Sequence, residues 1–298
     1  MTVMSQKSLS DLNAGSKDDF VSALANIFEY SPWIAGQAAS ARPFAGVKQL
    51  FEAMKAAVDR AAPELRLALI NAHPDLANKT QRAAGLTAES NAEQNSVGLD
   101  RLSDDEYAAF ERVNNAYREK FGFPYIVCVR RHTKDSILRD FERRLPNDAT
   151  AETQASIEEI CRIAALRLDQ LVTSDDRLPV HGRLSTHVLD THSGKPAAGI
   201  PVDLVELSAH GENRIVTRAV TNHDGRTDQP LIGGRPVPIG SYELRFNVAG
   251  YFASRNVPMS DPPFLDSIPL RFSVADAEGH LHVPLLVTPW SYATYRGS

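Results

Sequence analysis

The chain has 298 residues, a length that is typical of about two domains of ordinary size. Hydrophobic residues make up 43% and charged residues 23% of the sequence, so each half can bury a core of its own. The formal net charge is −5 and neither half is basic, so nothing in the composition favours binding to nucleic acid or to an anionic membrane.

Cysteine content and the two ends of the chain bear on the compartment. The two cysteines, Cys128 and Cys161, are too few for a disulfide framework and fit a reducing compartment. The first residues lack a continuous apolar run, and no stretch approaches the length of a membrane span. The terminal Tyr-Arg-Gly-Ser is not a peroxisomal signal. We therefore expect a cytoplasmic protein.

Helical periodicity dominates residues 1–172 and predicts an all-α domain. Ser103 and Glu106 have the spacing of a capping box, and Thr133 can cap another helix. A helix beginning after Ser16 is expected to carry Phe20, Leu24, Ile27 and Phe28 on one side. A long final helix is marked by Ile157, Ile160, Cys161, Ala164, Leu168 and Leu171.

The pattern changes after this helix. Residues 173–182 are polar and contain Pro179, which predicts a linker. Residues 183–298 contain short segments of alternating or strand-like composition, separated by turn sequences such as HSGK, HDGR and DAEGH. This pattern is typical of an antiparallel β-sandwich.

Two of these expected strands carry histidine opposite a probable core face. Alternation places Ser185 and His187 on one side of the first strand, and it places His280 and His282 together on the last long strand. A neutral imidazole can accept a proton from water near pH 7. Solvated strand histidines would give the same pattern. A metal site at His280 and His282 is a further alternative, but no spacing supplies a third ligand.

Three motifs in this half carry a family resemblance. The segments LSTHVLDTHSGKPA, TNHDGR and HVPLLVTPWSYATYRGS are similar to the transthyretin-related 5-hydroxyisourate hydrolases, over about Arg183 to Ser298. The resemblance implies a transthyretin-like sandwich and a homotetramer with its sites at the dimer–dimer contact. It also implies that His187, Arg226 and His282 are catalytic and substrate-binding residues, and that Tyr295 and Ser298 complete the site.

Residue chemistry agrees with these implied roles. One histidine can activate a water molecule, while Arg226 offers a planar fork of donors to the oxygens of a urate-like ring. No side-chain nucleophile is needed for this reaction. Taken alone, Arg226 could equally be a solvated turn residue, because it follows Asp-Gly.

The first half offers its own candidates. His73 precedes Pro74, so it should lie where a helix ends and could face a cleft. Arg167 flanks the apolar stripe of the final helix, where an arginine either extends to water or binds an anion. Glu93 and Gln94 lie in a polar segment and could simply be solvated. The apolar segment FGFPYIVCV could be core or pocket wall.

These pieces resemble 2-oxo-4-hydroxy-4-carboxy-5-ureidoimidazoline (OHCU) decarboxylase over about Ser16 to Val172, on the motifs NAHPDL, SNAEQ, FGFPYIVCV and the LRL of the last helix. The resemblance implies that His73 is the catalytic acid, assisted by Glu93 and Arg167, and that the decarboxylase domains pair as dimers. Tyr125 and Val97 are mild departures from residues common in the family. The resemblance places around the substrate Pro74, Ser90, Gln94, Tyr125, Ile126, Val127, Cys128 and Val129.

Together the two resemblances predict a bifunctional enzyme of urate degradation. The second domain would hydrolyse 5-hydroxyisourate to OHCU, and the first would decarboxylate OHCU to (S)-allantoin. The expected partners are these small molecules, with no nucleic acid, membrane, cofactor or metal. Two alternatives stay open from the sequence. One is a binding or scaffold protein that keeps both folds without turnover, and the other is an enzyme with only one active domain.

Overall fold

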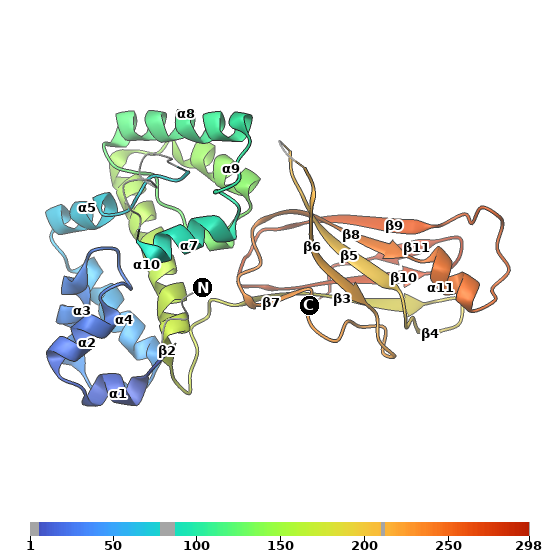
Figure 1. Ribbon diagram of the computed structural model, residues 1–298, viewed down its shortest axis with the longest axis horizontal. Helices are drawn as coiled ribbons and strands as arrows, with labels where there is room; N and C mark the ends of the chain where they lie inside the picture. The colour runs from blue at the N-terminus through green and yellow to red at the C-terminus, as the bar shows by residue number, and fades with distance from the viewer. Residues whose placement is uncertain (1–5, 78–86, 210–211, 298) are drawn as a thin grey trace. The chain divides into compact units, whose positions relative to one another are not determined.

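A computed structural model describes residues 6–77, 87–209 and 212–297. These residues divide into two compact units. The helical unit contains the residues up to Arg130 together with Ile137–Val180, and the β-rich unit contains Arg131–Ser136 together with the residues from His181 onward. The two-part organisation expected from the change in periodicity is present, with helices first and strands second (Figure 1).

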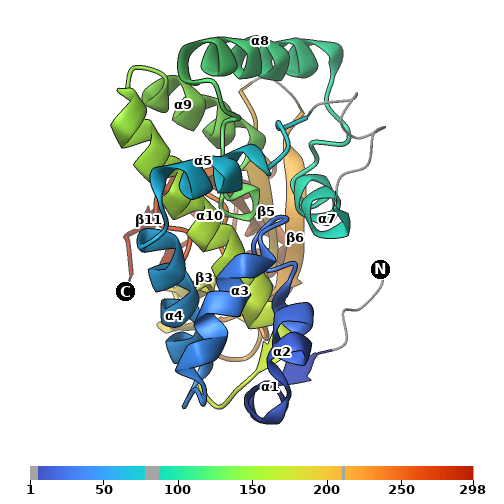
Figure 2. The same ribbon diagram turned by 90° about the vertical axis from the view of Figure 1, so that its left-hand side faces the viewer.

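Helices form most of the helical unit. Its longest helix, α10, is buried along much of its length and packs against α4 and α5, as Figures 1 and 2 show. The helices are α1 (Leu9–Ala14), α2 (Lys17–Leu24), α3 (Pro32–Ala38), α4 (Val47–Asp59), α5 (Pro63–Asn71), α7 (Ala88–Ser96), α8 (Asp104–Phe121), α9 (Lys134–Arg144) and α10 (Ala149–Leu171), with short 3-10 turns at Ala39–Ala41 and Val129–Arg131.

Two helices begin at the capping residues that the sequence predicts, and one helix ends earlier than predicted. Ser103 and Glu106 form both bonds of a capping box at α8, and the Thr133 hydroxyl accepts from Ser136 N at the start of α9. The prediction that one helix would carry Ile27 and Phe28 was wrong, because α2 ends at Leu24. Turns follow from Ala25 to Ser31, and the residue before Pro32 is biased away from helix, so Ile27 and Phe28 lie between α2 and α3.

The helical unit also contains a small amount of extended structure. Strands β1 (Lys7–Ser8) and β2 (Val172–Thr173) form a two-residue parallel pair that joins the start of the chain to the end of α10. The segment from Phe123 to Cys128 has no helix or strand, although it is buried. The prediction of a helical domain is therefore confirmed in outline, and these segments are its exceptions.

Two sheets form the β-rich unit. One has the order β11–β10–β3–β4, with β7 also paired to β3, and the other has the order β6–β5–β8–β9. The strands are β3 (Gly182–Asp190), β4 (Lys195–Pro196), β5 (Pro201–Leu207), β6 (Arg214–Val220), β7 (Ile232–Arg235), β8 (Gly240–Asn247), β9 (Ser267–Val274), β10 (His280–Val287) and β11 (Tyr292–Thr294), with helix α11 (Ala249–Ser254) between β8 and β9.

Pairing between β3 and β10 differs from the expected antiparallel pattern. These two strands are parallel, with Ser185 opposite His282 and Leu184 opposite Leu281. The remaining strand pairs of this unit are antiparallel. A hairpin forces antiparallel pairing only between strands that a short turn connects, and β3 and β10 are separated by the whole second sheet. Leu184, Val188 and Leu285 face the core as alternation predicts.

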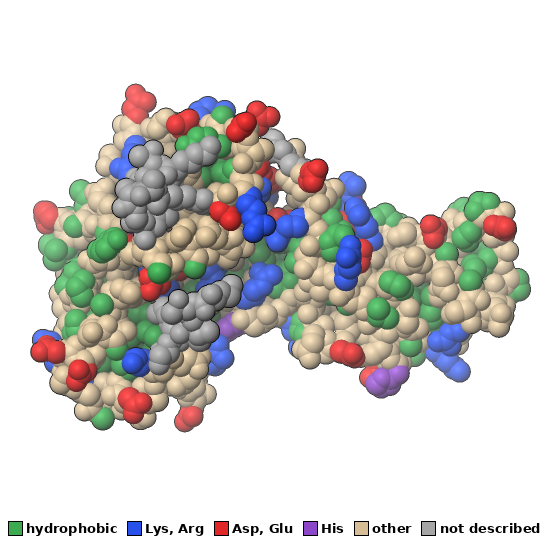
Figure 3. Space-filling view, in the orientation of Figure 1, with side chains coloured by type: hydrophobic (Ala, Val, Ile, Leu, Met, Phe, Trp, Pro, Cys, Tyr) green, Lys and Arg blue, Asp and Glu red, His purple; other side chains and the backbone are tan. Residues whose placement is uncertain are grey.

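Acidic and basic side chains both appear on the face of the helical unit that Figure 3 shows. Across the residues that the structure describes, no helix combines the length and the apolar character needed to cross a membrane.

Residues 173–180, which the sequence predicts to be linker, pack on the helical unit. Leu178 and Val180 belong to its hydrophobic core. The Asp176 carboxylate accepts hydrogen bonds from Val47 N at 2.7 Å and Lys48 N at 3.1 Å, at the first turn of α4. The N-cap residue of α4 is Gly46, which has no side chain to cap the helix. Asp176 therefore takes the capping role from 128 or more residues away in sequence.

We predict that Asp176→Ala lowers the free energy of unfolding of the helical unit by about 1 kcal/mol, the usual cost of losing an N-cap. Urea denaturation followed by the helical circular dichroism signal measures this change. Asp175→Ala is the matched control, because Asp175 is the exposed neighbouring carboxylate. Equal stability of the two variants would contradict the capping role of Asp176.

Candidate active sites

His73 lies where α5 ends, as the sequence predicts. Ala72 is the C-cap of α5, and Pro74 prevents the helix from continuing. The imidazole is buried, and its Nδ1 lies 2.9 Å from the Leu69 carbonyl oxygen. Because a carbonyl oxygen can only accept, Nδ1 carries the hydrogen and donates it. The lone pair of the neutral ring is then on Nε2.

Burial decides the protonation state of His73. Desolvation lowers the pKa of this imidazole to about 4, and the positive charge of Arg167 acts in the same direction. The Glu29 carboxylate and the bond to Leu69 oppose the shift without cancelling it. His73 is therefore neutral at pH 7 and must gain a proton before it can act as an acid.

Helix α7 presents three polar side chains on one face. Ser90, Glu93 and Gln94 are spaced i, i+3 and i+4, which places them side by side. Thr87 caps this helix by accepting from Ser90 N. Ser90 and Gln94 are buried, and Glu93 keeps 15% of its side chain exposed. The polar segment is thus a helix that faces inward and is not a solvated loop.

Arg167 does not extend to water. Its side chain is 4% exposed, and it is paired with Glu29 and Glu93. Its Nε and Nη2 donate to the two Glu93 oxygens at 2.8 Å each, and Nη1 donates to Glu29 Oε2 at 2.8 Å. Further bonds run from Nη1 to Asn26 O and from Nη2 to Ser90 Oγ. All five N–H groups of the guanidinium therefore have an acceptor.

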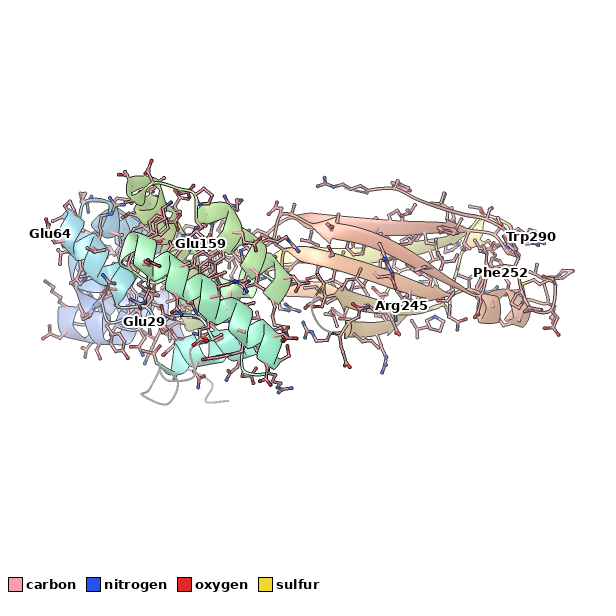
Figure 4. The ribbon with its side chains drawn as sticks, turned by 90° about the horizontal axis from the view of Figure 1, so that it is seen from above. Glu29, Glu64, Glu159, Arg245, Phe252 and Trp290 are labelled. Atoms are coloured by element: carbon pink, nitrogen blue, oxygen red, sulfur yellow. The ribbon has the colours of Figure 1, made fainter. Side chains whose placement is uncertain are left out.

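Glu29 is a member of this cluster that the sequence analysis missed. It is 2% exposed and lies among the helices of the unit (Figure 4). Burial raises the pKa of its carboxyl, but the charge of Arg167 and hydrogen bonds from Thr87 and Arg167 outweigh that effect and hold the pKa low. A signal was present in the sequence, because Glu29 interrupts the apolar run Ile27-Phe28 before Ser-Pro-Trp.

The segment from Tyr125 to Val129 forms one wall of the site. Side chains of α9 and α10 hold its backbone: Arg144 donates to Ile126 O at 2.7 Å, and Glu159 accepts from Cys128 N at 2.8 Å. The Tyr125 hydroxyl donates to Asp140. An irregular segment needs such partners, because buried backbone groups outside helices and strands cost free energy when they are unpaired.

These elements enclose a pocket with an empty volume of about 470 Å³, counting its open mouth. Every site residue predicted for the first half lines it, and their catalytic roles stay predictions. The lining residues are His73, Pro74, Leu76, Ser90, Glu93, Gln94, Tyr125, Ile126, Val127, Cys128, Val129, Arg130, Ile163, Leu166 and Arg167.

In the β-rich unit, a turn places Arg226 beside His187. The Asn222 side chain accepts from Arg226 N, and Gly225 O accepts from Val188 N at 2.8 Å. Gly225 has φ +72°, and a Cβ there would lie 2.3 Å from the Val188 carbonyl oxygen. Only glycine fits this close approach. The turn NHDGR is therefore fixed against β3. The backbone of Arg226 forms an isolated antiparallel β-bridge with the backbone of His187.

The C-terminal tail lies along His282. Gly297 N donates to His282 O at 3.0 Å, and a Cβ on Gly297 would lie 2.7 Å from the imidazole ring. Tyr295 is exposed, and Ser298 lies outside the described residues. The rings of His187 and His282 are 6.3 Å apart and inclined by 19°. The structure thus brings together the two histidines, Arg226 and the end of the tail.

Both histidines of this site are held neutral. Burial lowers the pKa of His187, and Arg226 adds to the effect. Burial also lowers the pKa of His282, with further contributions from Arg226, His187, His280 and Arg183. Each ring can therefore accept a proton at pH 7. Ser185, which the sequence analysis did not single out, contacts His282 through its hydroxyl.

Metal chemistry was one alternative for His280 and His282. In the described part of the chain, no group of three or more histidine, cysteine, aspartate or glutamate side chains is arranged to hold a metal ion. The polar partner that both imidazoles share is the Ser185 hydroxyl.

Comparison with known proteins assigns a family to each half. The OHCU decarboxylase family matches residues 13–169, and the HIUase/transthyretin family matches residues 184–297. A 5-hydroxyisourate hydrolase of Deinococcus radiodurans is 58% identical over 119 residues, which are 40% of this chain and 98% of that protein. A 2-oxo-4-hydroxy-4-carboxy-5-ureidoimidazoline decarboxylase of Haloferax volcanii is 41% identical over 172 residues, which are 58% of this chain and all of that protein.

A solved structure is similar to the chain over both halves. The crystal structure of (S)-allantoin synthase is 34% identical, with a TM-score of 0.52, and the match covers 98% of this chain and 100% of that one.

Because His73 is neutral in the folded chain, the stability of the helical unit should depend on pH. Its pKa is about 4 in the folded chain and near 6.5 when exposed, so between these values the unfolded chain binds a proton that the folded chain does not. Acidification therefore destabilises the helical unit, by about 2 kcal/mol at pH 5 from this group alone. His73→Asn should lose less stability than the wild type between pH 7 and pH 5. Parallel losses in urea denaturation would show that His73 is not buried in its neutral form.

Proposed function

Since the chain belongs to the OHCU decarboxylase family over residues 13–169 and to the HIUase/transthyretin family over residues 184–297, we propose that each unit carries one active site. The chain is a bifunctional enzyme of urate degradation. It hydrolyses 5-hydroxyisourate to OHCU and decarboxylates OHCU to (S)-allantoin. The convergence of His73, Glu93 and Arg167 in one pocket, separate from the His187–Arg226–His282 group, is the observation that supports this division.

Hydrolysis takes place at the histidine pair of the β-rich unit. A neutral imidazole of His187 or His282 removes a proton from water, whose oxygen attacks the ring carbonyl carbon. Arg226 donates hydrogen bonds to the oxygens of the ring, where negative charge develops. The carbon–nitrogen bond then breaks, and the ring nitrogen takes a proton. Tyr295 and Ser298 complete the substrate site in this proposal.

Decarboxylation takes place in the pocket of the helical unit. The bond from the ring carbon to the carboxylate breaks, and the imine of the substrate accepts the electron pair. Each turnover replaces a carboxylate by a carbon–hydrogen bond and so consumes one proton. His73 acquires that proton and delivers it from Nε2, because Nδ1 is held by Leu69. Delivery from one side of the pocket accounts for a single enantiomer of allantoin.

Arg167 acts on the substrate partly through Glu93. Because all five of its N–H groups have acceptors, a substrate oxygen can bind Arg167 only by replacing one of them. Glu93 is the more exposed of its two carboxylate partners, so it is the one that can turn toward the hydroxyl or ureido group of OHCU. Ser90, Gln94, Pro74 and the wall from Tyr125 to Val129 surround the substrate.

Assembly and compartment belong to the same proposal. Strands β9 and β11 are edges of their sheets, and an unpaired edge is a natural site for pairing with another copy. Tyr292 on β11 is exposed. These features support a homotetramer formed through the β-rich unit. We propose further that the decarboxylase units pair as dimers. Cys128 and Cys161 are present as thiols, outside any disulfide, which supports a cytoplasmic location. We propose residues 1–172 and residues 183–298 as the two domains.

We predict that His282→Asn and His73→Asn separate the two activities in the full-length chain. His282→Asn should slow 5-hydroxyisourate hydrolysis by about 10²–10⁴-fold, the usual contribution of a general base, and leave decarboxylation unchanged. His73→Asn should leave hydrolysis unchanged and let OHCU decay to racemic allantoin. Ultraviolet absorbance follows the first step, and the optical activity of the product follows the second.

His192→Asn is the control, because it removes an exposed histidine from the same β-rich unit. It should match the wild type in both assays. If either active-site variant kept wild-type rates of both steps, the corresponding site assignment would be wrong. If the wild type bound both compounds without turnover, the chain would be a binding protein.

A further inference from the structure

Ser185 connects two histidines of β10. Its hydroxyl oxygen lies 2.9 Å from His282 Nδ1 and 3.2 Å from His280 Nε2. The parallel register places His282 opposite Ser185, so the three side chains share one face of the sheet. His282 is half-buried, Ser185 is buried and His280 is exposed, so His280 is the member of the three that solvent reaches most easily.

The hydrolysis creates a proton that must leave. Water supplies two hydrogens: one goes to the leaving ring nitrogen, and the other belongs to the new carboxyl group. That group is ionised near pH 7, and the ureido nitrogen is not basic enough to hold the extra proton. One proton is therefore released in each turnover, into a site where both catalytic imidazoles are kept neutral.

Geometry allows this proton to leave by a relay. A serine hydroxyl has one hydrogen, so Ser185 can accept from one imidazole while it donates to the other. When His282 gains a proton on Nε2, its Nδ1 proton can pass to Ser185 Oγ, and the hydroxyl proton of Ser185 can pass to His280 Nε2. His280 then gives its Nδ1 proton to water. Exchange with solvent then returns His282 and His280 to their Nδ1–H tautomers, each losing one proton and gaining one, and rotation of the Ser185 hydroxyl returns its hydrogen to the His280 side.

Positive charge makes a retained proton on His282 unfavourable. After burial, the influences that lower the pKa of His282 are Arg226, His187, His280 and Arg183, all of them cationic or able to become so. Arg183 lies opposite His280 in the strand pairing, so these charges disfavour a lasting proton on His282 or His280 without setting the direction in which it leaves. His280 shares the Ser185 hydroxyl with His282 and lies in contact with solvent.

We infer that Ser185 and His280 form a proton-exit path from His282 to solvent during hydrolysis. The inference rests on the proposed hydrolase function of this unit. Ser185 and His280 act through His282, so they are positioning and relay residues, and neither is required to touch the substrate.

The test compares His280→Gln and Ser185→Ala with the wild type as full-length chains in weakly buffered solution. Glutamine can still hydrogen-bond to Ser185, but it cannot carry a proton. Each variant should hydrolyse 5-hydroxyisourate about tenfold more slowly, which is part of the 10²–10⁴-fold effect of acid–base catalysis. Rising concentrations of imidazole should restore the rate of both variants toward that of the wild type, since a small buffer can take the proton directly.

Two matched controls separate the relay from packing. Thr186→Val removes a buried hydroxyl that joins the same two strands through Val283 O but contacts neither histidine. His192→Gln removes an exposed histidine in the turn that follows β3. Both should keep the wild-type rate and show no response to imidazole.

The possible outcomes test the proton-exit path separately from the hydrolase function. Slow hydrolysis that imidazole restores in His280→Gln and Ser185→Ala supports the exit path. Wild-type rates in weak buffer, or slow rates that imidazole does not restore, overturn it and leave the hydrolase assignment intact. Absence of hydrolysis by the wild type would remove the proposed function itself.

Discussion

The pocket of the helical unit depends on one buried cation. Arg167, on α10, joins α7 through Glu93 and Ser90 to the turn after α2 through Glu29 and Asn26. Removing one partner of a buried ion pair commonly costs about 3–5 kcal/mol, because the remaining charge stays desolvated. Glu93 and Ser90, which line the pocket, therefore hold their places through the guanidinium of Arg167.

The two candidate sites keep histidine neutral by different means. His73 is desolvated by burial in the wall of its pocket, and a nearby carboxylate only partly offsets the effect. His187 and His282 lie in a half-buried site whose neighbours are cationic. The proton balance of the chemistry is complementary, because hydrolysis releases one proton and decarboxylation consumes one. A relay to solvent suits the first site, and a buried imidazole that must be loaded with a proton suits the second.

Sequence patterns predicted local structure better than they predicted contacts between elements that are distant in sequence. The capping box of Ser103, the end of α5 just before His73 and the alternation along β3 follow from neighbouring residues, so they could be predicted. The parallel pairing of β10 with β3 could not, because no short turn connects these strands. Glu29 and Ser185 were missed for the same reason. Their partners, Arg167 and His282, lie 138 and 97 residues away in sequence, and periodicity identifies a face without saying what it meets.

One measurement tests the central claim that a single chain carries out both steps. Freshly prepared 5-hydroxyisourate is added to the purified wild-type chain, and circular dichroism and ultraviolet absorbance are recorded together. The account predicts that 5-hydroxyisourate disappears faster than it decays without protein and that the allantoin formed is a single enantiomer. Racemic allantoin, appearing at the spontaneous rate, would contradict it.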